Sequence, residues 1–236
     1  MTRNPLERLL QRLPRRARVL ADWLIGLTIA VVIVLGLRAW VVTPYEIPTP
    51  SMEPTLHCAP STAKLTPPTS SVQPGQGQTT TPQKATHIAS ATCEGSSFLG
   101  FHFSDRILVN RFIYRFRSPH RGEIVVFKPP SIAAKICGGA STSVLVKRLI
   151  GLPGETVTER RGFIFIDGKK LKEPYIKPDR RDSNSGSWQV PQGWYFFMGD
   201  NRIASCDSRS WGPIPRKDLI GPAFMIYWPP NRISVF

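Results

Sequence analysis

The sequence predicts a mainly β protein, in which an antiparallel β-sheet domain follows one N-terminal transmembrane helix. A single long apolar run lies near the N-terminus, and the later apolar segments are short runs rich in β-branched and aromatic residues. No long segment after the first run has the 3.6-residue apolar period of an amphipathic helix. The expected organisation is a basic cytoplasmic tail over 1–18, a transmembrane anchor over 19–42 and an exported β-rich domain over 43–236.

The apolar run is long enough to serve as the anchor. No residue from Trp23 to Leu37 is charged, and counting through Arg38 extends the run to Val42, which reaches the length of about 20 residues that a bilayer span needs. Arg38 lies near the far end, where a long side chain can reach the interface. A cleaved signal peptide is the alternative, but the run is long for one and no clear small-x-small site follows it. A permanent anchor is therefore favoured.

The charge distribution predicts the orientation of this anchor. The net charge of +15 calls for an acidic partner, and residues 1–18 hold a single acid, Glu7, and six arginines: Arg3, Arg8, Arg12, Arg15, Arg16 and Arg18. The positive-inside rule places this tail in the cytoplasm, against anionic lipids. The domain then lies on the outer, periplasmic or lumenal side of a plasma or thylakoid-type membrane. Nucleic acid is not an expected partner, because the other basic residues are scattered and no RNA-binding signature or zinc-finger spacing occurs.

One segment of the exported part has a composition that opposes folding. In 59–97, 22 of the 39 residues are Ser, Thr, Pro or Gly and none is aromatic, so we expect a mobile surface insertion. Cys58 and Cys93 bracket most of it, which allows a disulfide in an oxidising compartment, while four unpaired thiols are the alternative. The four cysteines form no C-x-x-C pair, so we expect no metal site and no other cofactor.

Six runs beyond the insertion have the residue types of β-strands. They are Ile107–Val109, Glu123–Phe127, Val144–Leu149, Phe163–Ile166, Trp194–Met198 and Ala223–Trp228. Arg161-Gly162 and Asp167-Gly168 predict tight turns, and the second is a strong hairpin signal. An antiparallel domain with its function on loops and strand ends is expected.

Three segments carry polar residues that a plain β-domain does not need. In 47–56, three prolines within seven residues restrict the backbone around Ser51, although a stiff linker would have the same composition. In 145–155, Lys147 lies within an apolar strand beside Arg148. Adjacent strand residues face opposite sides, so one of the two is expected to face a covered side rather than solvent.

The third segment, 199–209, gathers many hydrogen-bonding groups in one loop. Asp207 and Arg209 predict an ion pair, and Asp200 could pair with Arg148. A calcium-binding loop fits poorly, because arginines are interleaved with too few acids.

In this order, and together with 104–111, these segments resemble the type I signal peptidases, also called leader peptidases, over nearly the whole chain. The resemblance implies a membrane-anchored serine endopeptidase. Such an enzyme removes N-terminal signal peptides from exported preproteins after small-x-small (Ala-x-Ala) sites. Its partners would be signal-peptide-bearing preproteins and the lipid bilayer.

The resemblance also implies residue roles. Ser51 would be the nucleophile, Lys147 the general base and Ser205 a hydroxyl that orients the lysine amine, while the Ser51 N–H and the Thr49 hydroxyl would form the oxyanion hole. Arg148, Asp200, Asp207 and Arg209 would support the site. The substrate pockets would be lined by Tyr45, Ile47, Met52, Leu56, Leu145 and Val146. Two features depart from the family pattern: Pro50 directly before the serine, and the 59–97 insertion.

Burial makes a lysine base chemically reasonable. A free lysine has a pKa of about 10.4, and burial can lower it by about 3–5 units.

Three other functions compete with that of a signal peptidase. A Ser-His-Asp hydrolase would use one of four histidines (His57, His87, His102 and His120), none of which has a supporting motif. A self-cleaving repressor is usually soluble. A non-enzymatic adaptor that binds anionic lipid would not need Ser51.

Overall fold

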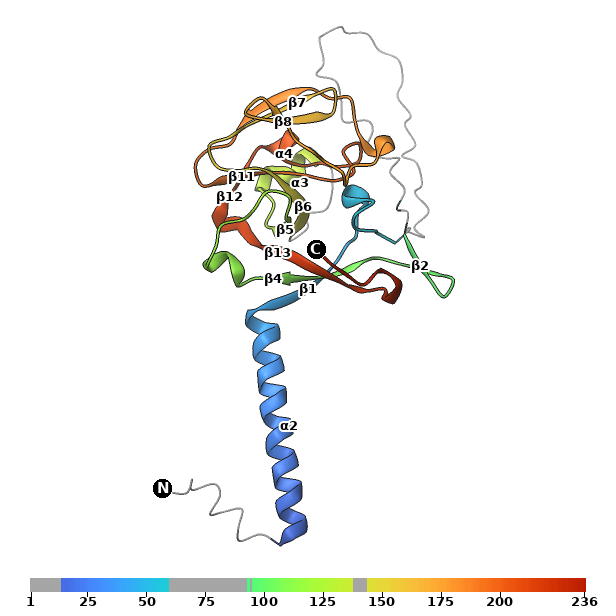
Figure 1. Ribbon diagram of the computed structural model, residues 1–236, viewed down its shortest axis with the longest axis vertical. Helices are drawn as coiled ribbons and strands as arrows, with labels where there is room; N and C mark the ends of the chain where they lie inside the picture. The colour runs from blue at the N-terminus through green and yellow to red at the C-terminus, as the bar shows by residue number, and fades with distance from the viewer. Residues whose placement is uncertain (1–13, 60–92, 94, 138–143) are drawn as a thin grey trace, which may run out of the picture. The chain divides into compact units, whose positions relative to one another are not determined.

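The computed structural model describes residues 14–59, 93, 95–137 and 144–236. The chain divides into two compact units, Met1–Thr43 and Pro44–Phe236. The described part of the first unit is mainly helix α2 (Arg15–Trp40) (Figure 1). Within α2, Val19–Gly36 has a mean hydropathy of 2.4 and is long and apolar enough to cross a membrane. The helix begins at Arg15 and so takes in the last turn of the basic segment, while the apolar window begins at Val19; the expected boundary of the anchor after residue 18 stays a prediction.

The second unit is built on an eight-stranded, mainly antiparallel sheet, as the sequence predicts. Its strands follow the order β1-β4-β13-β5-β6-β11-β12, and β14 pairs with β13. Their bounds are β1 (Val42–Glu46), β4 (Arg106–Asn110), β5 (Ile124–Phe127), β6 (Leu145–Gly151), β11 (Trp194–Met198), β12 (Ile214–Pro215), β13 (Leu219–Trp228) and β14 (Ser234–Val235). The central pairs β4–β13, β13–β5, β5–β6 and β6–β11 are all antiparallel.

Two smaller sheets complete the domain. One has the order β10 (Gly186–Gln189), β7 (Thr156–Arg160), β8 (Phe163–Ile166) and β9 (Lys169–Lys170). Arg161 and Asp167 adopt left-handed φ angles of 47° and 48° at the two predicted turns, each followed by glycine. The other is the hairpin of β2 (Ser96–Phe98) and β3 (Phe101–Phe103). Short helical turns join the strands: η1 (Pro50–Met52), η3 (Ile113–Arg115), α3 (Ser131–Cys137), η4 (Pro178–Arg180), α4 (Ser208–Trp211), η5 (Arg216–Asp218) and η6 (Pro230–Arg232).

The expected insertion extends too far at its C-terminal end. Ser96 belongs to β2, is 3% exposed and donates a hydrogen bond to Oδ1 of Asp105 at 2.9 Å. The hairpin is ordered because Phe98 and Phe103 pack edge-on against Trp228, aromatic contacts that lie just outside the low-complexity run. Residues 60–92 and 94 lie outside the described part, so the mobility of the insertion stays a prediction.

Two disulfides are present. Cys58 and Cys93 are bonded, with Cα atoms 5.2 Å apart, which selects one of the two alternatives left open by the sequence. Cys137 and Cys206 form a second bond that the sequence did not predict, since 69 positions separate them.

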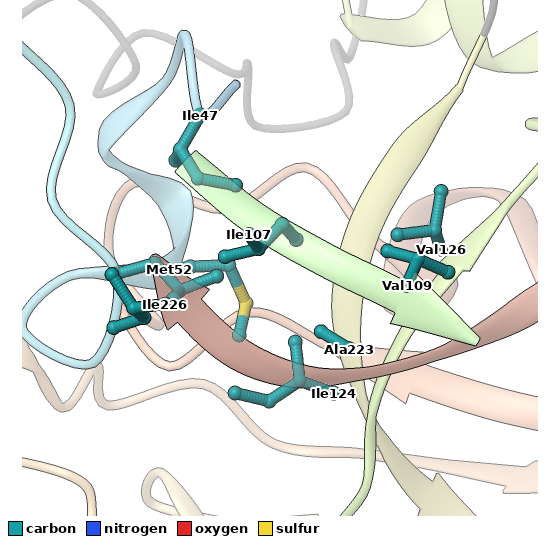
Figure 2. Close-up of a cluster of buried hydrophobic side chains, with 9 residues drawn as sticks. Ile47, Met52, Ile107, Val109, Ile124, Val126, Ala223 and Ile226 are labelled. Carbon is teal, nitrogen blue, oxygen red and sulfur yellow. The ribbon is translucent and has the colours of Figure 1, made fainter. Parts of the chain in front are cut away.

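The segment around Ser51 is part of the hydrophobic core. Figure 2 shows the cluster in which Ile47 and Met52 pack with side chains of β4, β5 and β13. Its members are Ile47, Met52, Leu56, Ile107, Val109, Ile124, Val126, Ala223 and Ile226. A stiff linker between anchor and domain would not bury three side chains to 2% exposure or less, so this alternative was wrong.

Candidate active site

The backbone around Ser51 forms one turn of 3₁₀ helix. Thr49 precedes it in extended conformation, and Pro50 takes the first helical position, which suits its fixed φ. The Glu53 N–H closes the turn on the Pro50 carbonyl at 3.1 Å. Met52 points into the core and anchors the turn, so Ser51 is held at the edge of the core with 6% exposure.

Asp105 joins the two ends of the segment 47–57. Its carbonyl accepts from the Ile47 N–H at 3.0 Å, and its own N–H donates to the His57 carbonyl at 2.8 Å. The Asp105 carboxylate accepts from the His57 N–H at 2.8 Å and from Arg232 at 2.9 Å. The serine segment is thus a loop whose two ends are held together by the buried Asp105, which is paired with the partly exposed Arg232.

Lys147 reaches this turn from β6. Its amine and the Ser51 hydroxyl are hydrogen-bonded, and the Thr49 hydroxyl lies 3.2 Å from Ser51 Oγ. Lys147 is only 3% exposed. Burial lowers the pKa of Lys147 to about 8, with the Asp207 carboxylate opposing this shift and Arg209 adding to it. A substantial fraction of this amine is therefore neutral near pH 8.

Arg148, the neighbour of Lys147, is also buried, at 9% exposure. The sequence predicted a covered position for one of the two, and the structure covers both. The Arg148 guanidinium can be buried because Asp200 accepts two hydrogen bonds from it, at 2.8 and 2.6 Å, and the Gly122 carbonyl accepts a third at 2.7 Å. Tyr175 stacks on it at 3.9 Å. The expected pairing of Asp200 with Arg148 is present.

Asp207 organises the loop 199–209. It accepts from Arg209 Nε at 2.8 Å and from the Gly199 N–H at 3.0 Å, so the expected Asp207–Arg209 ion pair is also present. Burial opposes ionisation of Asp207, but the Arg209 charge and these hydrogen bonds outweigh it and keep the pKa of Asp207 below its usual value. The carboxylate therefore stays charged near Lys147.

Ser205 lies beside the serine turn but does not bond to the lysine. Among the described residues its Oγ has no partner at hydrogen-bond geometry, although it lies near enough to Asp207 to favour that carboxylate's charge. A Cβ placed on Gly199 would lie 2.3 Å from Ser205 Oγ and 2.3 Å from the Ser51 carbonyl oxygen. Ser51, Gly199 and Ser205 thus meet without room for another methyl group.

The expected pocket residues do not form one exposed wall. Ile47, Met52 and Leu56 are core residues, while Tyr45 and Val146 are half-buried against the same cluster. Leu145 packs against a different cluster that contains Tyr195, Phe197 and Leu149, because neighbouring strand residues face opposite sides.

The histidines of the described residues lie away from the serine turn. Of the histidines there, His57 Nδ1 lies 3.3 Å from the Gly95 carbonyl, and none contacts Ser51. The part of the chain that the structure describes also has no cluster of His, Cys, Asp and Glu that could hold a metal. Sequence reasoning missed Gly199 and Asn201, which lie in the polar loop; only their contacts across the fold reveal them.

Comparison with known proteins shows the family of this chain. The family model described as "Signal peptidase, peptidase S26" matches residues 88–228. A probable signal peptidase I-2 from Synechocystis sp. is 33% identical over 207 residues, which is 87% of this chain and 72% of that protein. The chain belongs to the type I signal peptidase family of serine peptidases.

Two further likenesses concern shorter regions. Signal peptidase I of Leptolyngbya laminosa is 40% identical over 131 residues, so the match spans 56% of this chain and 64% of that relative. A solved signal peptidase I from Enterococcus faecalis has 30% identity and a TM-score of 0.37, and the match covers 45% of this chain and 97% of the other. The residues of this type I signal peptidase that the family model matches include Lys147 and the loop 199–209.

Proposed function

We propose that this chain is a membrane-anchored endopeptidase that removes signal peptides, with Ser51 as nucleophile and Lys147 as general base. The observation that carries the proposal is the buried Lys147–Ser51 hydrogen bond. Burial lowers the pKa of Lys147 to about 8, and a neutral amine in contact with a hydroxyl is a competent base.

In the acylation step, Ser51 Oγ attacks the carbonyl carbon of the scissile bond while its proton passes to Lys147 Nζ. The carbonyl oxygen becomes negative and is stabilised by the Ser51 N–H and the Thr49 hydroxyl. The lysine then gives its proton to the departing amine nitrogen as the C–N bond breaks. The signal peptide is left as an ester on Ser51.

Hydrolysis of this ester reverses the roles. Lys147 takes a proton from a water molecule, whose oxygen attacks the ester carbon through a second oxyanion. As the C–O bond to Ser51 breaks, the lysine returns the proton to the serine oxygen, and the signal peptide leaves as a carboxylic acid, which loses its remaining proton to solvent. Ser205 is the hydroxyl that would orient the protonated amine; in the structure it packs at Gly199 beside the Ser51 carbonyl and lies near Asp207, without a hydrogen bond to Lys147.

For specificity we propose cleavage after small-x-small sites. Tyr45 and Val146 are half-buried and pack against the core cluster that contains Ile47, Met52 and Leu56, so the part of the domain next to the Ser51 turn is apolar and closely packed. Leu145 packs against a separate cluster on the other face of β6, so its place in the pocket stays a prediction. Closely packed apolar side chains favour small residues over large ones at the adjoining substrate positions.

We further propose that α2 anchors the enzyme with its N-terminus in the cytoplasm. The hydropathy of Val19–Gly36 supports a membrane span, and the arginines before it support the orientation. Added protease should then cut the exported domain in spheroplasts and leave the arginine-rich tail protected. The reverse pattern would refute the orientation.

A cleavage assay tests the function itself. The purified full chain, in vesicles, is given a preprotein with an Ala-x-Ala site, and the new N-terminus is identified by mass spectrometry. We expect a single cut after the second Ala of the site with the native chain and none with Ser51→Ala. Equal cleavage by both would exclude Ser51 as the nucleophile, and cleavage by neither would exclude the proposal and leave the lipid-binding adaptor as the better account.

A further inference from the structure

Asn201 contacts the serine turn at two consecutive carbonyls. Its backbone N–H donates to the Ser51 carbonyl at 3.1 Å, and its side-chain Nδ2 donates to the Pro50 carbonyl at 3.2 Å. The residue is 1% exposed. It comes from the loop after β11, 150 positions from Ser51 in the sequence, so it ties two distant segments together at the nucleophile.

The bond to the Pro50 carbonyl bears on a group across the same peptide unit. The Pro50–Ser51 bond is not among the cis peptides, so its C=O and the Ser51 N–H point in opposite directions from one rigid plane. Whatever fixes the direction of the Pro50 carbonyl also fixes the direction of the Ser51 N–H. The Glu53 N–H holds this carbonyl along the turn, and Asn201 holds it from the neighbouring loop.

The Ser51 N–H is itself available. Within the described residues no acceptor is hydrogen-bonded to it, so it is a donor that points away from the Asn201 side of the turn. A preorganised donor stabilises an oxyanion only when it already points at the place where the charge develops.

We propose that Asn201 is a positioning residue, whose side-chain amide orients the Pro50–Ser51 peptide and thereby directs the Ser51 N–H at the oxyanion of the reaction. The proposal rests on the function proposed above. A purely structural role competes with it, because the Ala204 N–H donates to the Asn201 carbonyl at 3.2 Å and lies 3.3 Å from its Oδ1, which stabilises the turn of Asn201 itself.

Two substitutions separate these roles. Asn201→Asp keeps the shape and the Oδ1 acceptor for Ala204 but lacks the side-chain donor to Pro50. Asn201→Ala removes both without adding a charge. Since small misplacements of catalytic groups can cost up to about 100-fold, we expect kcat to fall about 10- to 100-fold in both variants, with KM within about twofold. The midpoint of the pH dependence of kcat/KM in Asn201→Ala should equal that of the native enzyme, because the substitution leaves the base, Lys147, unchanged.

A peptide aldehyde ending in Ala-x-Ala provides a direct readout of the oxyanion site. The Ser51 oxygen adds to the aldehyde carbon, its proton moves to Lys147, and the negative aldehyde oxygen occupies the oxyanion position. The affinity of the enzyme for the aldehyde should fall by the same factor as kcat/KM in both Asn201 variants. The corresponding peptide acid, which forms no such bond, should bind unchanged.

Ser208→Ala is the matched control. Ser208 is buried in the same region and accepts from the Phe197 N–H at 3.0 Å, without contact to the serine turn. This variant should lose thermal stability and keep kcat within about twofold, at a temperature where all variants are folded.

Several results would overturn the positioning role. These are kcat within twofold of the native value, an altered KM or pH midpoint in Asn201→Ala, an unchanged aldehyde affinity, or failure of both Asn201 variants to fold. Failure of the proposed function would look different, because the native chain itself would not cleave the preprotein or Ser51→Ala would remain active.

Discussion

At the scale of single residues, the chemistry of the site depends on how the fold surrounds one amine. Lys147 has almost no contact with solvent, and the carboxylates of Asp207 and Asp200 and the guanidinium of Arg209 lie near it. The two carboxylates raise the pKa of the amine and the guanidinium lowers it, but burial is the largest effect and leaves the pKa below its ordinary value. With a pKa of about 8, Lys147 changes from the protonated to the neutral form around pH 8.

The pH dependence of cleavage follows from this environment. A base must be neutral, and below a pKa of about 8 the amine of Lys147 is mostly protonated. We therefore expect kcat/KM to fall about tenfold per pH unit below 8 and to level off above it. A pH series on a peptide substrate measures this. An inflection near 6.5, the ordinary value for histidine, would instead indicate a histidine base.

Thr49 offers a second test at this scale. Its hydroxyl lies 3.2 Å from Ser51 Oγ, where it can donate to a developing oxyanion. Valine has nearly the same shape without a donor, so Thr49→Val should lower kcat about 10²–10³-fold with little change in KM. Thr49→Ser keeps the hydroxyl and should stay close to the native rate. Equal, mild effects of both substitutions would mean that the hydroxyl only stabilises its own turn.

The main residues of the site could be named before the structure, but not their surroundings. Ser51 and Lys147 stand out through the prolines around one and the apolar strand around the other. The pairing of Arg148 with Asp200 was predicted, but the burial of Arg148 also depends on Gly122 and Tyr175, which come from two other segments and could not be inferred. A local pattern does not contain such contacts.

At the scale of elements, the end of β11 and the η1 turn approach so closely that the residue between them has no room for a side chain. Gly199 lies where these two backbones meet Ser205. Interiors are close-packed, so an added methyl group must displace something. The atoms within 3 Å of a Cβ placed on Gly199 belong to Ser51 and Ser205, two residues of the proposed site.

Gly199→Ala is therefore expected to inactivate the enzyme. Its Cβ would lie 2.3 Å from the Ser51 carbonyl oxygen, and moving that backbone by even 1 Å can cost about 100-fold in rate. The measurement is kcat on an Ala-x-Ala peptide. Gly168→Ala is the control: its left-handed φ of 79° makes alanine strained, but nothing lies within 4 Å. The control should lose stability and keep its rate; near-native activity in Gly199→Ala would contradict the packing argument.

Strands were predictable where their residues are apolar on both faces or strongly β-branched. β5 reads Ile-Val-Val-Phe, and all four side chains are buried. β7 and β10 were missed, because Thr-Val-Thr-Glu-Arg and Gly-Ser-Trp-Gln mix polar residues with few apolar ones. Their pairing with each other, and not local preference, makes them strands.

At the scale of the whole molecule, long-range links assemble the site. Ser51 and Lys147 are 96 positions apart, and the Cys137–Cys206 disulfide connects α3 to the residue between Ser205 and Asp207. The order of the strands and this second disulfide depend on the three-dimensional path of the chain. They could not be predicted from any local feature of the sequence.

The second disulfide should contribute to stability. It closes a loop between positions 69 apart, and such bonds typically stabilise by about 2–4 kcal/mol. Cys137→Ser, Cys206→Ser and the double variant should all lose the same free energy of unfolding, as measured by denaturant titration of the detergent-solubilised chain. A double variant much less stable than either single one would mean that the cysteines act separately and not as a bond.

The central claim is that Ser51 and Lys147 act as one catalytic unit. It is tested most directly by measuring kcat for Ser51→Ala, Lys147→Ala and the double variant on the same preprotein, with Arg160→Ala, an exposed position on β7, as the control expected at the native rate. Groups that act together are strongly non-additive, so both single variants should fall to the same residual rate and the double variant should fall no further. Losses that multiply in the double variant, or substantial cleavage by Lys147→Ala, would contradict the account.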